Sequence, residues 1–82
     1  MVVFTKREQK GGELMPLLDS KVIGNRLKTL RGDKTIKEVA ESLSISESAL
    51  SMYETGNRIP RDEIKIRIAQ YYDKSVQSIF YA

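Results

Sequence analysis

Apolar residues recur three or four positions apart over most of the chain after residue 20, which places them on one face of a helix. Polar and glycine-containing breaks divide this pattern, so the sequence predicts a series of short helices. The helical segments span about residues 21–31, 35–43, 46–55, 60–72 and 75–80. The region shows no strand-like alternation. We therefore expect an all-α domain, a compact five-helix bundle.

Start and stop signals bound the two central helices. Thr35 and Glu38 have the spacing of a capping box, in which each side chain accepts a hydrogen bond from the other residue's amide. Ser46 stands at the N-cap position of the next helix, and Gly56 supplies the left-handed residue that ends it. Residues 35–56 are therefore predicted to form two helices joined by a tight turn, the helix-turn-helix arrangement.

Three apolar residues of this segment, Ala40, Ile45 and Leu50, have spacings that fit the angle between its two helices. Ala40 is small, which lets the helix axes cross closely. Each residue alone is an ordinary core residue. Their joint spacing with the two caps indicates the motif.

Residues 1–20 do not share the helical pattern. Gly11 and Gly12 separate the apolar residues 2–4 from a second apolar stretch, 14–18, which contains Pro16. The glycines and the proline argue against one long helix. A mobile tail and a two-stranded ribbon that turns at the glycines are the alternatives. The predicted organisation is an N-terminal arm, residues 1–20, outside a helical domain, residues 21–82.

Composition narrows the classes of function. The 82 residues include neither Cys nor His, which removes disulfides, thiolate metal sites and the commonest general base. Ser, Tyr and Lys occur without a metal-ligand set or a phosphate-binding loop. We therefore expect no enzyme, no catalytic residues, no cofactor and no metal. Fourteen Lys and Arg against 11 Asp and Glu give a net charge of +3, which permits nucleic-acid binding without requiring it.

The apolar runs of the sequence are all shorter than the roughly 18 residues that a membrane-spanning helix needs. The apolar residues at the start are too few for the core of a signal peptide. We therefore expect no membrane association and a cytoplasmic location.

The helical region resembles the phage-repressor-like helix-turn-helix family, the Xre or Cro/C1 type of transcriptional regulator. The resemblance covers about residues 22–80. It is carried by residues 26–31, 37–41, 45–46, 49–51, 53–56, 60, 68–69 and 75–80. It implies a lambda-repressor-like DNA-binding domain of five helices whose third helix reads the major groove of double-stranded DNA. It also implies a repressor that binds a near-palindromic operator as a homodimer.

The resemblance places the base-contacting residues on the exposed start and middle of the third helix, at Glu47, Ser48, Ser51 and Met52. A serine hydroxyl can hydrogen-bond to a base edge, and a methionine can pack on a thymine methyl group. Glu47 can accept a hydrogen bond from cytosine N4. Alternatively, its solvated charge stabilises the N-terminus of the helix.

Contacts to the DNA backbone are expected from cations and small polar groups around this helix. The candidates are Arg26, Lys28, Lys34, Thr35, Lys37, Asn57, Arg58 and Arg61. Arg58 and Arg61 are favoured because they flank Pro60 in a stiff loop. The resemblance also implies a structural salt bridge between Arg31 and Glu54.

Two residues depart from the family pattern. Ser44 occupies the turn position where the family usually has Gly, so a non-Gly residue is predicted in the left-handed region at a cost of roughly 1–2 kcal/mol. Ile36 stands where a Gln frequently contacts phosphate, so that contact is not expected here.

Apolar residues near the C-terminus, Tyr71, Ile79, Phe80 and Tyr81, are candidates for a dimer interface, and the alternative is that they close the core. The N-terminal arm is a second candidate: it could exchange between subunits or lay its basic residues on DNA. An alternative function is an antitoxin-like or adaptor module that binds a protein partner through this arm. A steep salt dependence of binding to random DNA would favour the regulator.

Overall fold

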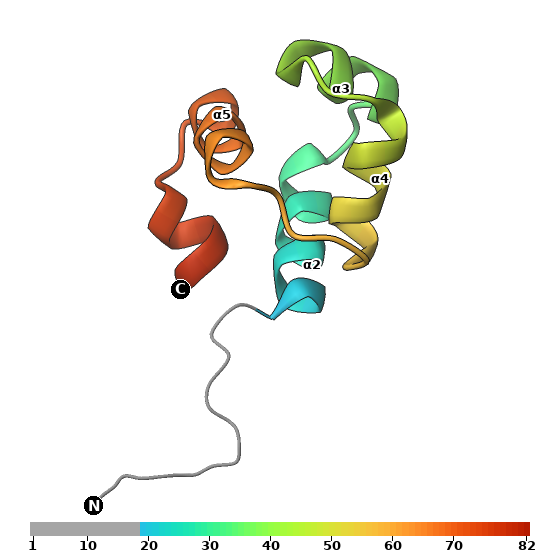
Figure 1. Ribbon diagram of the computed structural model, residues 1–82. Helices are drawn as coiled ribbons and strands as arrows, with labels where there is room; N and C mark the ends of the chain where they lie inside the picture. Colours follow the sequence, from blue (N-terminus) through green and yellow to red (C-terminus); the bar gives the residue numbers. More distant parts are fainter. Residues whose placement is uncertain (1–18) are drawn as a thin grey trace, which may run out of the picture.

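Four α-helices and a C-terminal π-helix follow one another along residues 19–82, the part of the chain that the computed structural model describes (Figure 1). They are α2 (Ser20–Arg31), α3 (Ile36–Leu43), α4 (Glu47–Thr55), α5 (Asp62–Tyr72) and η1 (Gln77–Tyr81). Residues 19–82 contain no strand, which confirms the predicted all-α five-helix fold. The alternatives for the N-terminal arm, a tail or a ribbon, concern residues that lie almost entirely outside this range.

Helix α2 lies at the centre of the fold, between α4 on one side and η1 on the other. Helix α4 packs along α2, and α3 packs against both α4 and α5. Helix η1 returns to contact α2, so α5 and η1 lie on the opposite side of α2 from α4 (Figure 1). The core between them consists of Ile23, Leu27, Val39, Ala40, Leu43, Leu50, Tyr53, Ile64, Ile68, Ala69, Ile79 and Phe80. Within residues 19–82, no helix is long and apolar enough to cross a membrane.

Side chains cap the N-termini of α2, α3 and α4, and those at Thr35, Glu38 and Ser46 were predicted. The carboxylate of Asp19 accepts hydrogen bonds from the amides of the first turn of α2 at 3.0 and 3.3 Å. Thr35 Oγ1 accepts from the Glu38 amide at 3.0 Å, and Glu38 Oε1 accepts from the Thr35 amide at 3.1 Å. Ser46 Oγ accepts from the Ala49 amide at 3.0 Å. These bonds satisfy amides that have no partner inside their own helix.

Two predicted boundaries differ from the structure. Helix α5 begins at Asp62 rather than Pro60, because Arg61 is extended (φ −68°, ψ 164°) and Pro60 is buried ahead of the helix. The last element is a π-helix rather than an α-helix. In its wide turn the neighbours Ile79 and Phe80 are both buried in the core.

A glycine that the sequence analysis did not single out sets the distance between α2 and α4. Gly24 is buried in the middle of α2 and faces the last turn of α4. A Cβ atom at this position would collide with the carbonyl oxygen of Glu54 and lie 2.9 Å from its carbonyl carbon. Only glycine therefore permits this close approach of the two backbones.

The turn between α3 and α4 passes through the left-handed region. Ser44 has φ 58° and ψ 43°, which confirms the prediction for this position. Its amide donates to Glu41 O at 3.1 Å, and the Ile45 amide donates to Ala40 O at 3.0 Å. These bonds satisfy carbonyls at the end of α3 and turn the chain directly into α4.

Candidate nucleic-acid interface

Helix α4 divides its residues between the core and the solvent. Leu50 and Tyr53 are buried on its inner side. The four residues predicted to contact bases lie elsewhere on the helix: Glu47, Ser48 and Ser51 are exposed, and Met52 is partly buried. Because residues three and four positions apart are neighbours on a helix, these four side chains form one surface. It offers two hydroxyls, one carboxylate and one thioether.

The N-terminus of α3 presents a group of hydrogen-bond donors. The Thr35 hydroxyl oxygen accepts the Glu38 amide, which leaves its own hydrogen free to be donated outward. The amides of the first turn of α3 carry the positive end of the helix dipole. Lys34 and Lys37 are exposed on either side of Thr35. Ile36 packs partly buried against the core, consistent with its apolar character.

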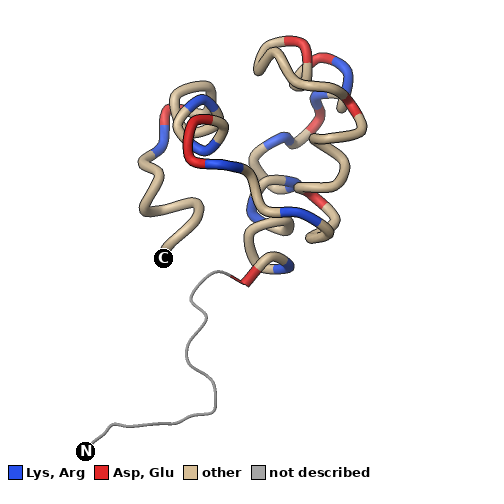
Figure 2. The backbone as a smooth tube through the Cα atoms, viewed as in Figure 1, with Lys and Arg blue, Asp and Glu red and all other residues tan. Residues whose placement is uncertain are grey.

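The loop from α4 to α5 supplies a second basic group. Gly56 ends α4 at φ 81°, and the Asn57 amide donates to Met52 O at 2.9 Å, so the loop turns back along the helix end. Asn57, Arg58 and Arg61 are all exposed. Figure 2 shows basic residues on this loop and near the start of α3, the two flanks of α4.

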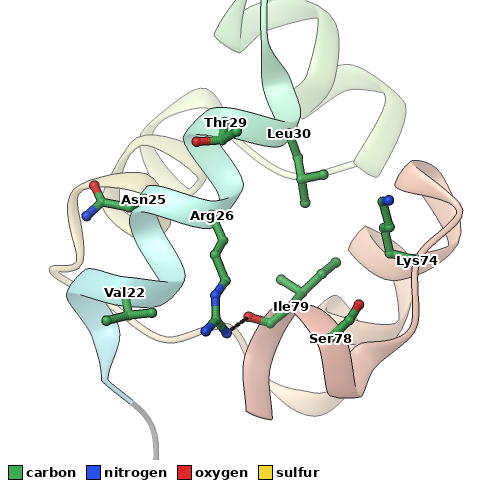
Figure 3. A pocket seen from close by; sticks show the side chains of 8 residues that line it. All are labelled: Val22, Asn25, Arg26, Thr29, Leu30, Lys74, Ser78 and Ile79. Carbon is green, nitrogen blue, oxygen red and sulfur yellow. Dashed lines mark hydrogen bonds between the residues drawn. The ribbon is translucent and has the colours of Figure 1, made fainter. Parts of the chain in front are cut away.

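Arg26 has a different position from the other predicted phosphate ligands. Its Nη1 donates to Ile79 O at 2.9 Å, across the gap between α2 and η1 (Figure 3). Its Nη2 donates to Ala82 O at 2.6 Å. These bonds hold the C-terminal segment against α2. The guanidinium is therefore directed away from α4, and the predicted phosphate contact does not fit this geometry.

Arg31 and Glu54 are joined by two hydrogen bonds, Nε to Oε2 at 2.8 Å and Nη2 to Oε1 at 3.0 Å. The Glu54 side chain is 3% exposed and that of Arg31 is 21% exposed. The hydrogen bonds that the guanidinium donates to the Glu54 carboxylate raise the pKa of Arg31 above its usual value. The remaining Nη1 donates to Lys34 O at 2.8 Å, which fixes the loop ahead of α3.

The predicted dimer residues do not form one exposed surface. Ile79 and Phe80 are each 2% exposed, so both belong to the core and their assignment to an interface is wrong. Tyr71 is partly buried and stacks edge-to-face with Tyr72, with 4.9 Å between ring centroids. Tyr81 is 46% exposed.

A buried lysine beside Tyr81 was missed by the sequence analysis. Lys65 is 5% exposed, and its Nζ donates to Tyr81 Oη at 3.0 Å. Nζ also lies 5.8 Å from the ring centre of Phe80 and 5.1 Å from that of Tyr81, so it makes cation–π contacts with both. Lys65 stands three residues before Ile68 and therefore on the same, inner face of α5, and this spacing could have predicted its burial.

The described residues provide no evidence of a metal site. Within residues 19–82, no cluster of three or more His, Cys, Asp or Glu side chains could hold a metal ion.

Known proteins share this arrangement. The family model described as helix-turn-helix matches residues 27–79, from the middle of α2 into η1. The crystal structure of the clp gene regulator ClgR from C. glutamicum is similar, with a TM-score of 0.65 and 28% sequence identity. The similarity covers 79% of this chain and 86% of that one. No curated protein matches the chain.

Proposed function

The chain belongs to the Cro/C1-type helix-turn-helix family, and from this premise we propose that α4 is a recognition helix that enters the major groove of operator DNA. The family and the likeness to a clp gene regulator support a DNA-binding transcriptional regulator.

The exposed surface of α4 between two basic flanks carries the proposal. Ser48 and Ser51 offer hydroxyls that can donate to or accept from base edges. Met52 offers an apolar contact for a thymine methyl group, and Glu47 offers an acceptor for cytosine N4. None of these contacts is a bidentate arginine or asparagine pair. We therefore expect modest discrimination from each base position.

The two flanks are proposed to contact phosphates on either side of the groove. Lys34, Thr35 and Lys37 form the flank at the start of α3, and its hydroxyl and free amides suit a phosphate oxygen. Asn57, Arg58 and Arg61 form the flank after α4. Contacts of this kind fix the orientation of the protein on the duplex and supply sequence-independent affinity.

Dimerisation is proposed because α4 is short. Its nine residues span about 14 Å, enough for a few base pairs. Two copies on half-sites about 34 Å apart would double the contacts and favour a near-palindromic operator. Exposed Tyr81 and partly buried Tyr71 remain available for such an interface. Repression would follow if the operator overlaps a promoter.

Selection of binding sites from a random duplex pool tests this function. We expect enrichment of a sequence with approximate two-fold symmetry, with half-site centres about 10 base pairs apart. Ser48→Ala and Met52→Ala should each change the preferred base at particular positions, whereas Gln70→Ala, an exposed change on α5, should not. An unchanged selected site in all α4 variants would show that α4 is not the reading helix. Failure to bind duplex DNA, or binding whose affinity does not change with salt, would favour a protein-binding module instead.

A further inference from the structure

A groove of about 500 Å³ lies between α2 and η1, on the side of α2 opposite the proposed DNA surface (Figure 3). Val22, Leu30 and Ile79 give it an apolar floor, and Asn25, Thr29 and Ser78 lie at its edges. Val22 is 41% exposed, although it is an apolar residue on a packed helix. The groove is thus an apolar surface that the described residues leave uncovered, and the DNA-binding proposal does not use it.

We propose that residues 14–18 of the same chain occupy this groove. This stretch, Leu14 to Leu18, is entirely apolar and directly precedes the N-cap of α2. Its last residue stands only four positions before Val22, which lines the groove. The proposal is independent of the proposed DNA function.

The cap of α2 gives the segment its direction. Asp19 is the N-cap, so Leu18 stands immediately before it and Ile23 is the fourth residue of the helix. Apolar residues at these two positions commonly pack together as a hydrophobic staple, which fixes the angle at which the chain enters the helix. A contact of this kind would hold Leu18 at the first turn of α2, beside the Val22 end of the groove.

The length of the segment matches the groove. Along α2, the eight-residue step from Val22 to Leu30 covers about 12 Å. Five extended residues span about 17 Å, enough to run antiparallel to α2 over this distance. In this orientation Leu17 lies near Asn25, and Leu14 lies farther along α2, near Thr29 and Leu30.

Charge favours the same occupant. The groove lining contains two cations, Arg26 and Lys74, and no acidic residue. Glu13 directly precedes the apolar stretch and would arrive at the end of the groove near Lys74. The docked segment would cover Val22 and press η1 against α2, adding to the two hydrogen bonds that Arg26 already makes with Ile79 in η1 and with Ala82 after it.

Disulfide trapping tests the proposal, because the chain has no cysteine of its own. The full chain carries either Leu14→Cys with Thr29→Cys or Leu17→Cys with Asn25→Cys. The matched control pairs Leu14→Cys with Lys28→Cys, since Lys28 is exposed but does not line the groove. Under mild oxidation we expect both groove pairs to close within one chain about tenfold faster than the control.

Each other outcome overturns the proposal. Equal closure rates for the groove pair and the control would mean that the segment does not occupy the groove. Disulfide-linked dimers in place of closed monomers would assign the groove to the segment of a second copy. A second measurement does not depend on cysteines: Leu14→Ser, Leu17→Ser and Leu18→Ser together should increase the fluorescence of an added naphthalene sulfonate dye several-fold. Val2→Ser, Val3→Ser and Phe4→Ser together should leave it unchanged, and a result without this difference would contradict the proposal.

Discussion

The guanidinium of Arg31 donates two hydrogen bonds to the carboxylate of Glu54, which joins the end of α2 to the end of α4. The same guanidinium donates its third hydrogen bond to Lys34 O at 2.8 Å. One side chain therefore connects α2, α4 and the loop that leads to α3. Because the proposed phosphate contacts begin at Lys34, this pair also determines where the first basic flank lies relative to α4.

Arg31→Met should destabilise the domain by about 3 kcal/mol, because it leaves the buried Glu54 carboxylate without its partner. Arg31→Met combined with Glu54→Leu should recover much of this loss, since no unpaired charge remains. Urea unfolding of the single and double variants measures the difference. If the double variant is as unstable as the sum of its two single changes, the two residues are not energetically coupled.

Gly24→Ala should destabilise the domain by about 1–3 kcal/mol, although alanine is the better helix former. The added methyl group meets the backbone of Glu54, which cannot rotate away as a side chain could. Denaturant unfolding measures the loss, and Asn25→Ala at the neighbouring exposed position is the control. An unchanged or higher stability for Gly24→Ala would mean that α2 and α4 are not held at this distance.

The sequence predicted the helical part of the fold well because its signals are local. The capping box at Thr35 and Glu38 and the stop at Gly56 each act within a few residues. The left-handed conformation of Ser44 was predicted from its place in the turn of the helix-turn-helix, where the family usually has glycine. Such features depend on neighbours in the chain, so their spacing is visible without the tertiary structure.

Features that depend on distant contacts were not predictable in this way. Arg26 is a plausible phosphate ligand by chemistry, but the C-terminal segment returns to α2, and the carbonyls of Ile79 and Ala82 accept hydrogen bonds from its guanidinium. Ile79 and Phe80 are apolar near a terminus, which fits an interface as well as a core. Lys65 is buried because the Tyr81 hydroxyl, two aromatic faces and the Asp62 carboxylate, 3.6 Å away, surround its ammonium. Each of these outcomes is decided by helix packing rather than by residue type.

Ser44→Gly should stabilise the domain by about 1 kcal/mol. Ser44 adopts φ 58°, a region that costs a residue with a Cβ atom roughly 1–2 kcal/mol, and glycine avoids most of this strain. The gain is reduced because glycine is more flexible in the unfolded chain. A higher urea midpoint with an unchanged slope is the expected result. Ser42→Gly, two residues earlier inside α3, should instead lower stability.

Tyr72 should make the stability of the domain depend on alkaline pH. Burial, with smaller contributions from Tyr71 and Glu54, raises the pKa of Tyr72 from 10.0 to about 12. The folded state therefore favours the protonated phenol. Its contribution is complete below pH 10 and is lost as the pH rises through about 12. The unfolding free energy of the native chain should therefore fall across this range relative to that of Tyr72→Phe, which has no phenol to ionise at this position.

A spectroscopic titration checks the same group directly. The tyrosinate absorbance of the native chain minus that of Tyr72→Phe reports Tyr72 alone, and this difference should have its midpoint at about pH 12. A difference with its midpoint at pH 10 would show that Tyr72 is solvated in the folded state. Tyr81→Phe is the comparison, because Tyr81 is 46% exposed.

Arg58→Ala should weaken binding to all duplex sequences and reduce the slope of log K against log salt by about 0.9. This change follows from the loss of one phosphate contact, since Arg58 lies exposed on the loop after α4. Lys74→Ala removes the same charge from the connection between α5 and η1, away from α4 (Figure 1). It should leave the slope nearly unchanged. Equal slope changes for the two variants would indicate that general charge, and not a contact at the α4–α5 loop, drives binding.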